Sequence, residues 1–292
     1  MMAVFRRELG ALMRGMTGWL VMASAPLVFM VMTALHLLSG SAADYIRVIT
    51  DSTIAYGFVG LVYAAQGFAK DRRMGADRLM HALPISAPKL VLGRYFALCV
   101  PFAAGVAFSC LYPVGIAFYA DIAVWQAVFG MLLYLLGGMH VIALALYVSR
   151  VGKNAYLNAF IALGVLFLCY YLPDIAGALV SVGMGYWGAL ITLALVGVWF
   201  GWKATRSAVP ALVCGLVVEG VALLGMDGGG AAVAFWNMLA STVNIQSHFT
   251  ALYIGVLNIE DIAYFLLSIA FLLSLSMVGW YMERMGKRRA EK

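Results

Sequence analysis

The sequence predicts an all-α, polytopic membrane protein, and three observations lead to that prediction. Hydrophobic residues make up 64% of the 292-residue chain and charged residues only 11%, which is too little polar surface to coat a soluble globule of this length. Apolar runs close to the roughly 20 residues that cross a bilayer recur along the whole chain. These runs are continuous rather than alternating, which favours helices over a β-barrel.

Eight of these runs are predicted to be transmembrane helices, and residues 1–292 are expected to form one transmembrane domain. In order, the predicted spans are 19–38, 52–69, 91–118, 124–149, 155–172, 178–202, 208–225 and 261–282. The third is longer than a straight crossing needs and contains Pro101 and Pro113, which predicts tilt and a kink. The fifth and seventh are short enough to be re-entrant, so six crossings is the alternative count.

Residues 1–16, ahead of the first span, have apolar side chains near one side of a helix and charged side chains over the rest. This pattern predicts an interfacial elbow helix that lies on the membrane surface. The alternative is an ordinary basic flank of the first span.

The positions of the basic residues predict the orientation, because Lys and Arg resist transfer across the membrane during insertion. With eight spans and a cytoplasmic N-terminus, every Lys and Arg except Arg47 falls on the inner side. Both termini are therefore expected to be cytoplasmic, in a multi-pass protein of the cell inner (cytoplasmic) membrane. Anionic membrane lipid accounts for the net charge of +6, so no nucleic-acid partner is expected.

The longest charged stretch inside the chain, residues 70–94, lies between the second and third predicted spans. Its first part predicts a short amphipathic helix, followed by a stop at Pro84 and a new helix start capped by Ser86. A rigid surface helix of this kind, in a cytoplasmic loop over residues 70–90, can serve as a docking element for a soluble partner.

Twelve positions in this stretch form a pattern that is similar to one in a known family. They are Asp71, Arg72, Arg73, Gly75, Asp77, Leu79, Leu83, Pro84, Ile85, Ser86, Gly93 and Arg94. The chain thereby resembles type-2 permeases of ATP-binding-cassette exporters, in the branch of the gliding-motility and sodium- or copper-linked permease subunits. Ala76 stands where that branch usually has threonine.

A second match lies ahead of the last span, in a segment predicted to be on the outer face, residues 227–258. The family's phenylalanine, glycine and Ile-x-Asp pattern is met by Phe249, Gly255 and Asp261, with Glu260 beside the aspartate. The break at Gly255 suggests a pair of short outer helices or a re-entrant lid.

The resemblance implies a permease subunit that moves an unidentified substrate with ATP hydrolysed by separate ATPase subunits. Its partners would be these cytoplasmic ATPases and a second permease subunit, identical or related. Docking on the ATPase would fall to the coupling helix within residues 70–90. The residues implied in this coupling are Asp71, Arg72, Arg73, Gly75, Asp77, Arg78, Leu79 and Pro84.

The chain itself is expected to be no enzyme and to bind no cofactor or metal. It has no G-x-x-x-x-G-K-[ST] phosphate loop, so ATP and Mg would be bound by the partner ATPase. Its four histidines are scattered without the spacing of a metalloprotease, and this ranks an intramembrane enzyme last.

Two polar groups inside predicted spans are further functional candidates, Glu219 and His140. A charge at that depth in lipid is costly, so Glu219 should face the bundle, be protonated or pair. Either residue can be a structural hydrogen-bonding group instead, and a lone histidine among apolar neighbours is usually one. The alternative function is a proton-coupled secondary transporter that uses Glu219.

Overall fold

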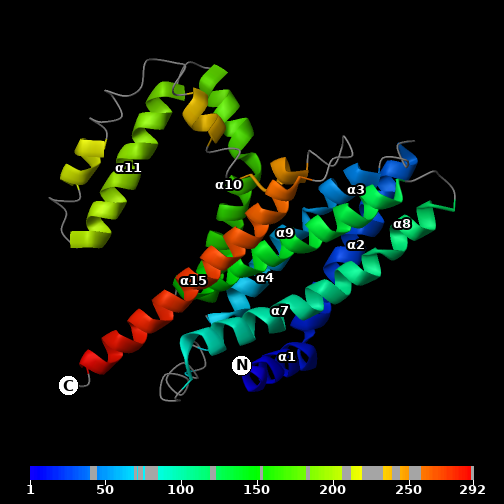
Figure 1. The fold of residues 1–292 in the computed structure, drawn as a ribbon, viewed down its shortest axis with the longest axis horizontal. Helices are drawn as coiled ribbons and strands as arrows, with labels where there is room; N and C mark the ends of the chain where they lie inside the picture. Colours follow the sequence, from blue (N-terminus) through cyan, green and yellow to red (C-terminus); the bar gives the residue numbers. More distant parts are fainter. Residues whose placement is uncertain are drawn as a thin grey trace. The chain divides into compact units, whose positions relative to one another are not determined.

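The computed structural model describes most of the chain, as twelve separate parts. These are residues 1–39, 45–68, 71, 75, 85–118, 123–151, 154–181, 185–205, 212–218, 233–238, 244–249 and 258–290. Within them the chain is helical and contains no strand (Figure 1), so the all-α prediction is confirmed. The chain divides into two compact units, the first made of Met1–Phe167 with His248–Lys292 and the second of Leu168–Ser247.

The first unit is a bundle of long helices with a short helix at its N-terminus. Its elements are α1 (Met2–Arg14), α2 (Met16–Leu38), α3 (Tyr45–Ser52), α4 (Ala55–Gln66), α7 (Ala87–Ser109), α8 (Leu111–Ile116), α9 (Val124–Val151), the first part of α10 (Ala155–Ser181) and α15 (Ile259–Ala290). The second unit contains the end of α10, α11 (Gly185–Thr205) and the start of the 3-10 turn η1 (Gln246–Phe249).

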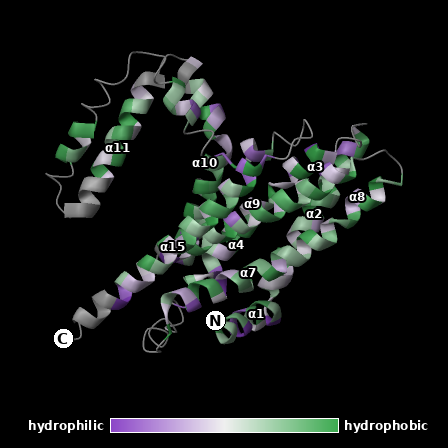
Figure 2. Ribbon diagram, in the orientation of Figure 1, coloured by the Kyte–Doolittle hydropathy of each residue, from purple (hydrophilic) through white to green (hydrophobic). Residues whose placement is uncertain are grey.

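Six helical segments in the described residues are long and apolar enough to cross a membrane. They are Met16–Leu38, Tyr45–Gln66, Ala87–Ile116, Val124–Arg150, Ala155–Ala178 and Ile259–Arg284. Figure 2 shows that apolar residues dominate these helices. A polytopic helical membrane protein is therefore confirmed, while the count of eight spans, the orientation and the choice of membrane stay predictions.

Two of the predicted spans, 52–69 and 155–172, differ from the helices in their bounds. The span predicted at 52–69 begins earlier, at Tyr45, and a turn at Thr53–Ile54 divides it into α3 and α4. The short span predicted to end at Leu172 is instead the long helix α10, which continues through Pro173. A proline removes one backbone hydrogen bond and kinks a helix, but in lipid the other backbone groups still require helical partners. Of 208–225, only residues 212–218 are described.

Aromatic side chains and glycines set the packing of the first unit, where α2 packs on α7, and α4 and α15 pack on α9. The buried hydroxyl of Tyr56 donates to the carbonyl of Tyr134 at 2.6 Å, which joins α4 to α9. Tyr63 donates to the carbonyl of Leu98 at 2.9 Å, which joins α4 to α7. At Gly105 of α7, an added Cβ would overlap the carbonyl oxygen of Met22 on α2. These helices therefore approach to backbone contact.

The N-terminal segment forms the helix α1, which packs on α7 and α2. Val4 is buried there, and a Cβ added at Gly93 of α7 would lie 3.2 Å from the Cβ of Val4. Trp19 of α2 also donates from its indole nitrogen to the carbonyl of Met13 at 2.9 Å. The helix expected over residues 1–16 is thus present, and its place on the membrane surface stays a prediction.

Candidate functional site

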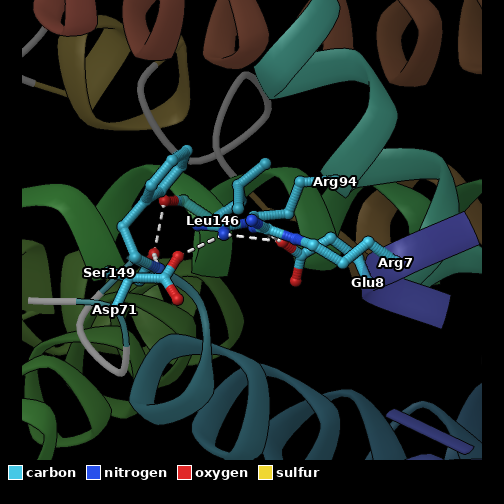
Figure 3. A network of polar contacts seen from close by, with 7 residues as sticks. Arg7, Glu8, Asp71, Arg94, Leu146 and Ser149 are labelled. Carbon is cyan, nitrogen blue, oxygen red and sulfur yellow. Dashed lines mark hydrogen bonds and ion pairs between the residues drawn. The ribbon is translucent and has the colours of Figure 1, made fainter. Parts of the chain in front are cut away.

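A buried arginine joins three parts of the chain at the base of the predicted coupling loop. Arg94 lies about two turns into α7, and only 3% of its side chain is exposed. Its Nη2 atom pairs with Oε1 of Glu8 at 2.9 Å and with Oδ2 of Asp71. Figure 3 shows the two carboxylates on either side of the guanidinium. Arg94 therefore links α1, the start of the loop and α7.

The charges of this cluster balance. Arg7 also pairs with Glu8, at 2.5 Å, so two arginines face the two carboxylates of Glu8 and Asp71. Burial alone would raise the pKa of Glu8, but the nearby guanidinium of Arg94 and that of Arg7 outweigh burial and lower this pKa. Glu8 is therefore held in its charged form, as a pair of buried opposite charges requires.

A small cavity adjoins the cluster. It has a volume of about 60 Å³, and Glu8, Thr17, Gln66 and Arg94 are among its lining residues. The Nε and Nη1 atoms of Arg94 are buried and have no hydrogen-bond partner among the described residues. The cavity is large and polar enough for water to serve these donors.

Phe68 and Ser149 extend the cluster to α9. The ring of Phe68 lies 4.4 Å from Cζ of Arg94, a cation–π contact on the face of the guanidinium. The backbone N–H of Phe68 donates to Oγ of Ser149 at 3.1 Å. Ser149 donates in turn to the carbonyl of Leu146 at 2.7 Å (Figure 3). The chain just after α4 is thereby fastened to α9.

The far end of the loop is held by α15. Arg284 donates from Nη1 to the carbonyl of Ile85 at 3.1 Å, just before α7 begins. On the same stretch of α15, Glu283 pairs with Nη2 of the buried Arg150 of α9 at 3.1 Å, and the carbonyl of Ser276 accepts from its Nη1. Gly279 leaves the room for this arginine, since a Cβ there would lie 2.7 Å from its nitrogens.

The loop is thus fastened at both of its described ends, by Asp71 to α1 and α7 and by Ile85 to α15. A force applied to the loop between these points would reach the helix bundle through charged hydrogen bonds rather than through a slack linker. The arrangement is suited to mechanical transmission, and it contains no group set for bond-making chemistry among its members.

The other predicted coupling residues lie mostly outside the described residues. These are Arg72, Arg73, Asp77, Arg78, Leu79 and Pro84. Gly75 is described and exposed, with a φ of 73°, a left-handed conformation that glycine adopts without strain. Glu8 was not predicted as a site residue. The sequence did contain a signal, since Glu8 is the sole acidic residue before Asp44 and lies in a basic segment.

The predicted intramembrane and outer-face residues have separate outcomes. His140 is buried in α9, and its Nδ1 lies 2.7 Å from Oγ of Ser268 on α15, as a structural histidine would. Asp261 is buried at the start of α15 and Glu260 is exposed. Phe249 is fully buried against Phe265. Glu219 and Gly255 lie outside the described residues.

The described part of the chain holds no group of three or more His, Cys, Asp or Glu side chains that could bind a metal ion. No protein-family model matches the sequence, and a search of curated proteins found no match.

Proposed function

We propose that the chain is the membrane-spanning permease subunit of an ATP-binding-cassette exporter. It would move a substrate across the cytoplasmic membrane, paired with a second permease subunit and driven by separate ATPase subunits. The proposal starts from the pattern in residues 71–94 that resembles the coupling loop of type-2 permeases.

The observation that carries the proposal is the fastening of the loop at both ends. Asp71 is held by Arg94, which also holds Glu8 of α1, and Ile85 is held by Arg284 of α15. A loop that only connected two spans would not need buried ion pairs at its base, because each buried charge costs several kcal/mol in desolvation before pairing repays it. A loop that transmits force does need rigid attachment.

In the proposed mechanism, ATP binding closes a pair of ATPase subunits and displaces the docked loop. The fastened ends would pass this displacement to α1, α7 and α15, and the spans would tilt until a pathway opens at the interface of two permease subunits. The energy comes from ATP bound by the partner ATPase. This chain contributes the loop that transmits the movement and part of the transport pathway.

Charge reversal in the loop tests this function. The tagged protein, purified in mild detergent from its native membrane, is expected to retain a soluble subunit that hydrolyses ATP. Arg73→Glu or Asp77→Arg should each reduce the amount of retained ATPase activity by about tenfold or more, since like charges then face each other at the docking surface. The measurement is ATP turnover per permease in the purified complex.

Arg47→Glu is the matched control, because Arg47 is exposed in α3 and predicted to lie on the opposite side of the membrane. It should leave assembly and turnover unchanged. Tight assembly and normal turnover in both loop variants would refute the proposal. Transport that needs a pH gradient but no ATP, and that Glu219→Gln abolishes, would favour the proton-coupled alternative.

A further inference from the structure

A hydrogen bond between a histidine and an aspartate fastens the chain at the point where it returns to the first unit. His248 is the first residue of the returning segment, and Asp261 lies in the first turn of α15. Nδ1 of His248 lies 2.7 Å from Oδ1 of Asp261, and their side chains are only 15% and 11% exposed. Both groups are therefore largely removed from solvent, where a charged hydrogen bond is strongest.

Aromatic rings surround this pair. The imidazole of His248 stacks on the ring of Tyr264, with centroids 3.8 Å apart and planes 20° apart. Phe265 lies edge-on to the same imidazole at 5.7 Å, and the adjacent Phe249 packs on Phe265 at 6.2 Å. A protonated imidazole over a tyrosine face gains a cation–π interaction that a neutral imidazole lacks.

The titratable groups that face His248 come from two helices. Asp261 and Tyr264 belong to α15, and Glu260 beside them is exposed. The imidazole of His140 on α9 also lies near Tyr264, with ring centroids 6.2 Å apart. Its Nδ1 atom forms a hydrogen bond with Oγ of Ser268. Protonation of His140 would oppose a charge on His248, so the two imidazoles must be tested separately.

The carboxylate of Asp261 depends on His248 for its balancing charge. Its other oxygen, Oδ2, is buried without a hydrogen-bond partner among the described residues. The Nε2 atom of His248 is also buried without a hydrogen-bond partner among the described residues, which costs free energy when this atom carries a proton. Each group therefore has the other as its described partner, and a buried carboxylate without a counter-charge costs more than one unsatisfied donor.

We propose that His248 and Asp261 form a proton-binding clasp that holds the end of η1 on the first turn of α15. Uptake of one proton by His248 converts the hydrogen bond between a neutral imidazole and the Asp261 carboxylate into an ion pair stacked on Tyr264, and this closes the clasp. Loss of this proton weakens the clasp and frees the segment at His248–Phe249. The attachment is therefore stronger at low pH than at high pH.

Hydrogen–deuterium exchange of the full chain in lipid nanodiscs tests the clasp. After correction for the intrinsic pH dependence of exchange, peptides containing His248 and Phe249 should exchange about tenfold more slowly at pH 5.5 than at pH 8. This is the difference expected between an ion pair and a hydrogen bond from a neutral imidazole to the same carboxylate. Histidine gains its proton in this range. His248→Gln, which keeps a donor but cannot titrate, should show equal protection at both pH values.

Three controls make the outcome decisive. Asp261→Asn should lose the protection gained at low pH, because it removes the counter-charge. His36→Gln should leave the effect intact, since His36 pairs with Asp51 at 2.9 Å elsewhere in the unit. Equal protection of the unchanged protein at both pH values would overturn the clasp. A full pH effect on exchange in His248→Gln would also overturn it. Loss of the pH effect in His140→Gln alone would overturn it as well.

Discussion

Replacing Arg94 by leucine is expected to destabilise the protein by about 3–5 kcal/mol, the cost of leaving buried charges without a partner. The substitution strands Glu8, of which 19% is exposed, and Asp71, of which 14% is exposed. It also removes the cation from the face of Phe68. At roughly 2–4 °C per kcal/mol for a chain of this size, the midpoint of thermal unfolding in detergent should fall by about 10 °C.

Neutralising the three buried members of the cluster should undo most of that loss. In the triple variant Glu8→Gln, Asp71→Asn, Arg94→Leu no buried charge remains unpaired, and replacing a complete buried ion pair is often close to neutral. Arg47→Leu is the matched control, since it removes an exposed arginine and should shift the midpoint little. A triple variant that is as unstable as the single variant would contradict the assignment of Arg94 as the charge partner of both carboxylates.

Replacing Gly105 by leucine is expected to separate α2 from α7. The new Cβ would overlap the carbonyl oxygen of Met22, a backbone atom that cannot rotate away as a side chain can. Overpacking of this kind costs about 1–3 kcal/mol when neighbours can shift, and more when they cannot. Thermal unfolding in detergent measures the change.

Gly164→Leu is the matched control for this effect. Gly164 lies in α10 with nothing within 4 Å of an added Cβ, so leucine there should be neutral or slightly stabilising through its helix propensity. Equal destabilisation by the two substitutions would show that the loss comes from the helices themselves rather than from close contact between α2 and α7.

The long helices were predictable because lipid leaves a continuous apolar run few alternatives to a helix. The runs at 19–38 and 124–149 correspond to α2 and α9 to within a few residues. The end of one span was predicted wrongly. The span predicted at 155–172 ends at Leu172, but α10 continues through Pro173 to Ser181, since a proline in lipid bends a helix more readily than it stops one.

The candidate site was predicted in part. Asp71 and Arg94 stand in the loop pattern, but their pairing with each other and with Glu8 depends on tertiary packing, and 86 positions separate Glu8 from Arg94 in the chain. Gly93 stands in the same pattern, but its role of letting α1 approach α7 was not predicted. Contacts of this range follow from how the helices pack, which hydrophobic periodicity alone does not specify.

The most direct test of the account is the side of the membrane on which residues 70–90 lie. A cysteine at Ala76, in a variant whose four native cysteines are replaced by alanine, should react with a membrane-impermeant maleimide in inverted vesicles and stay unreactive in intact cells. Labelling in inverted vesicles alone is the predicted result, because an ATPase can reach the loop only from the cytoplasm. Labelling in intact cells would place the loop outside and contradict the proposed function.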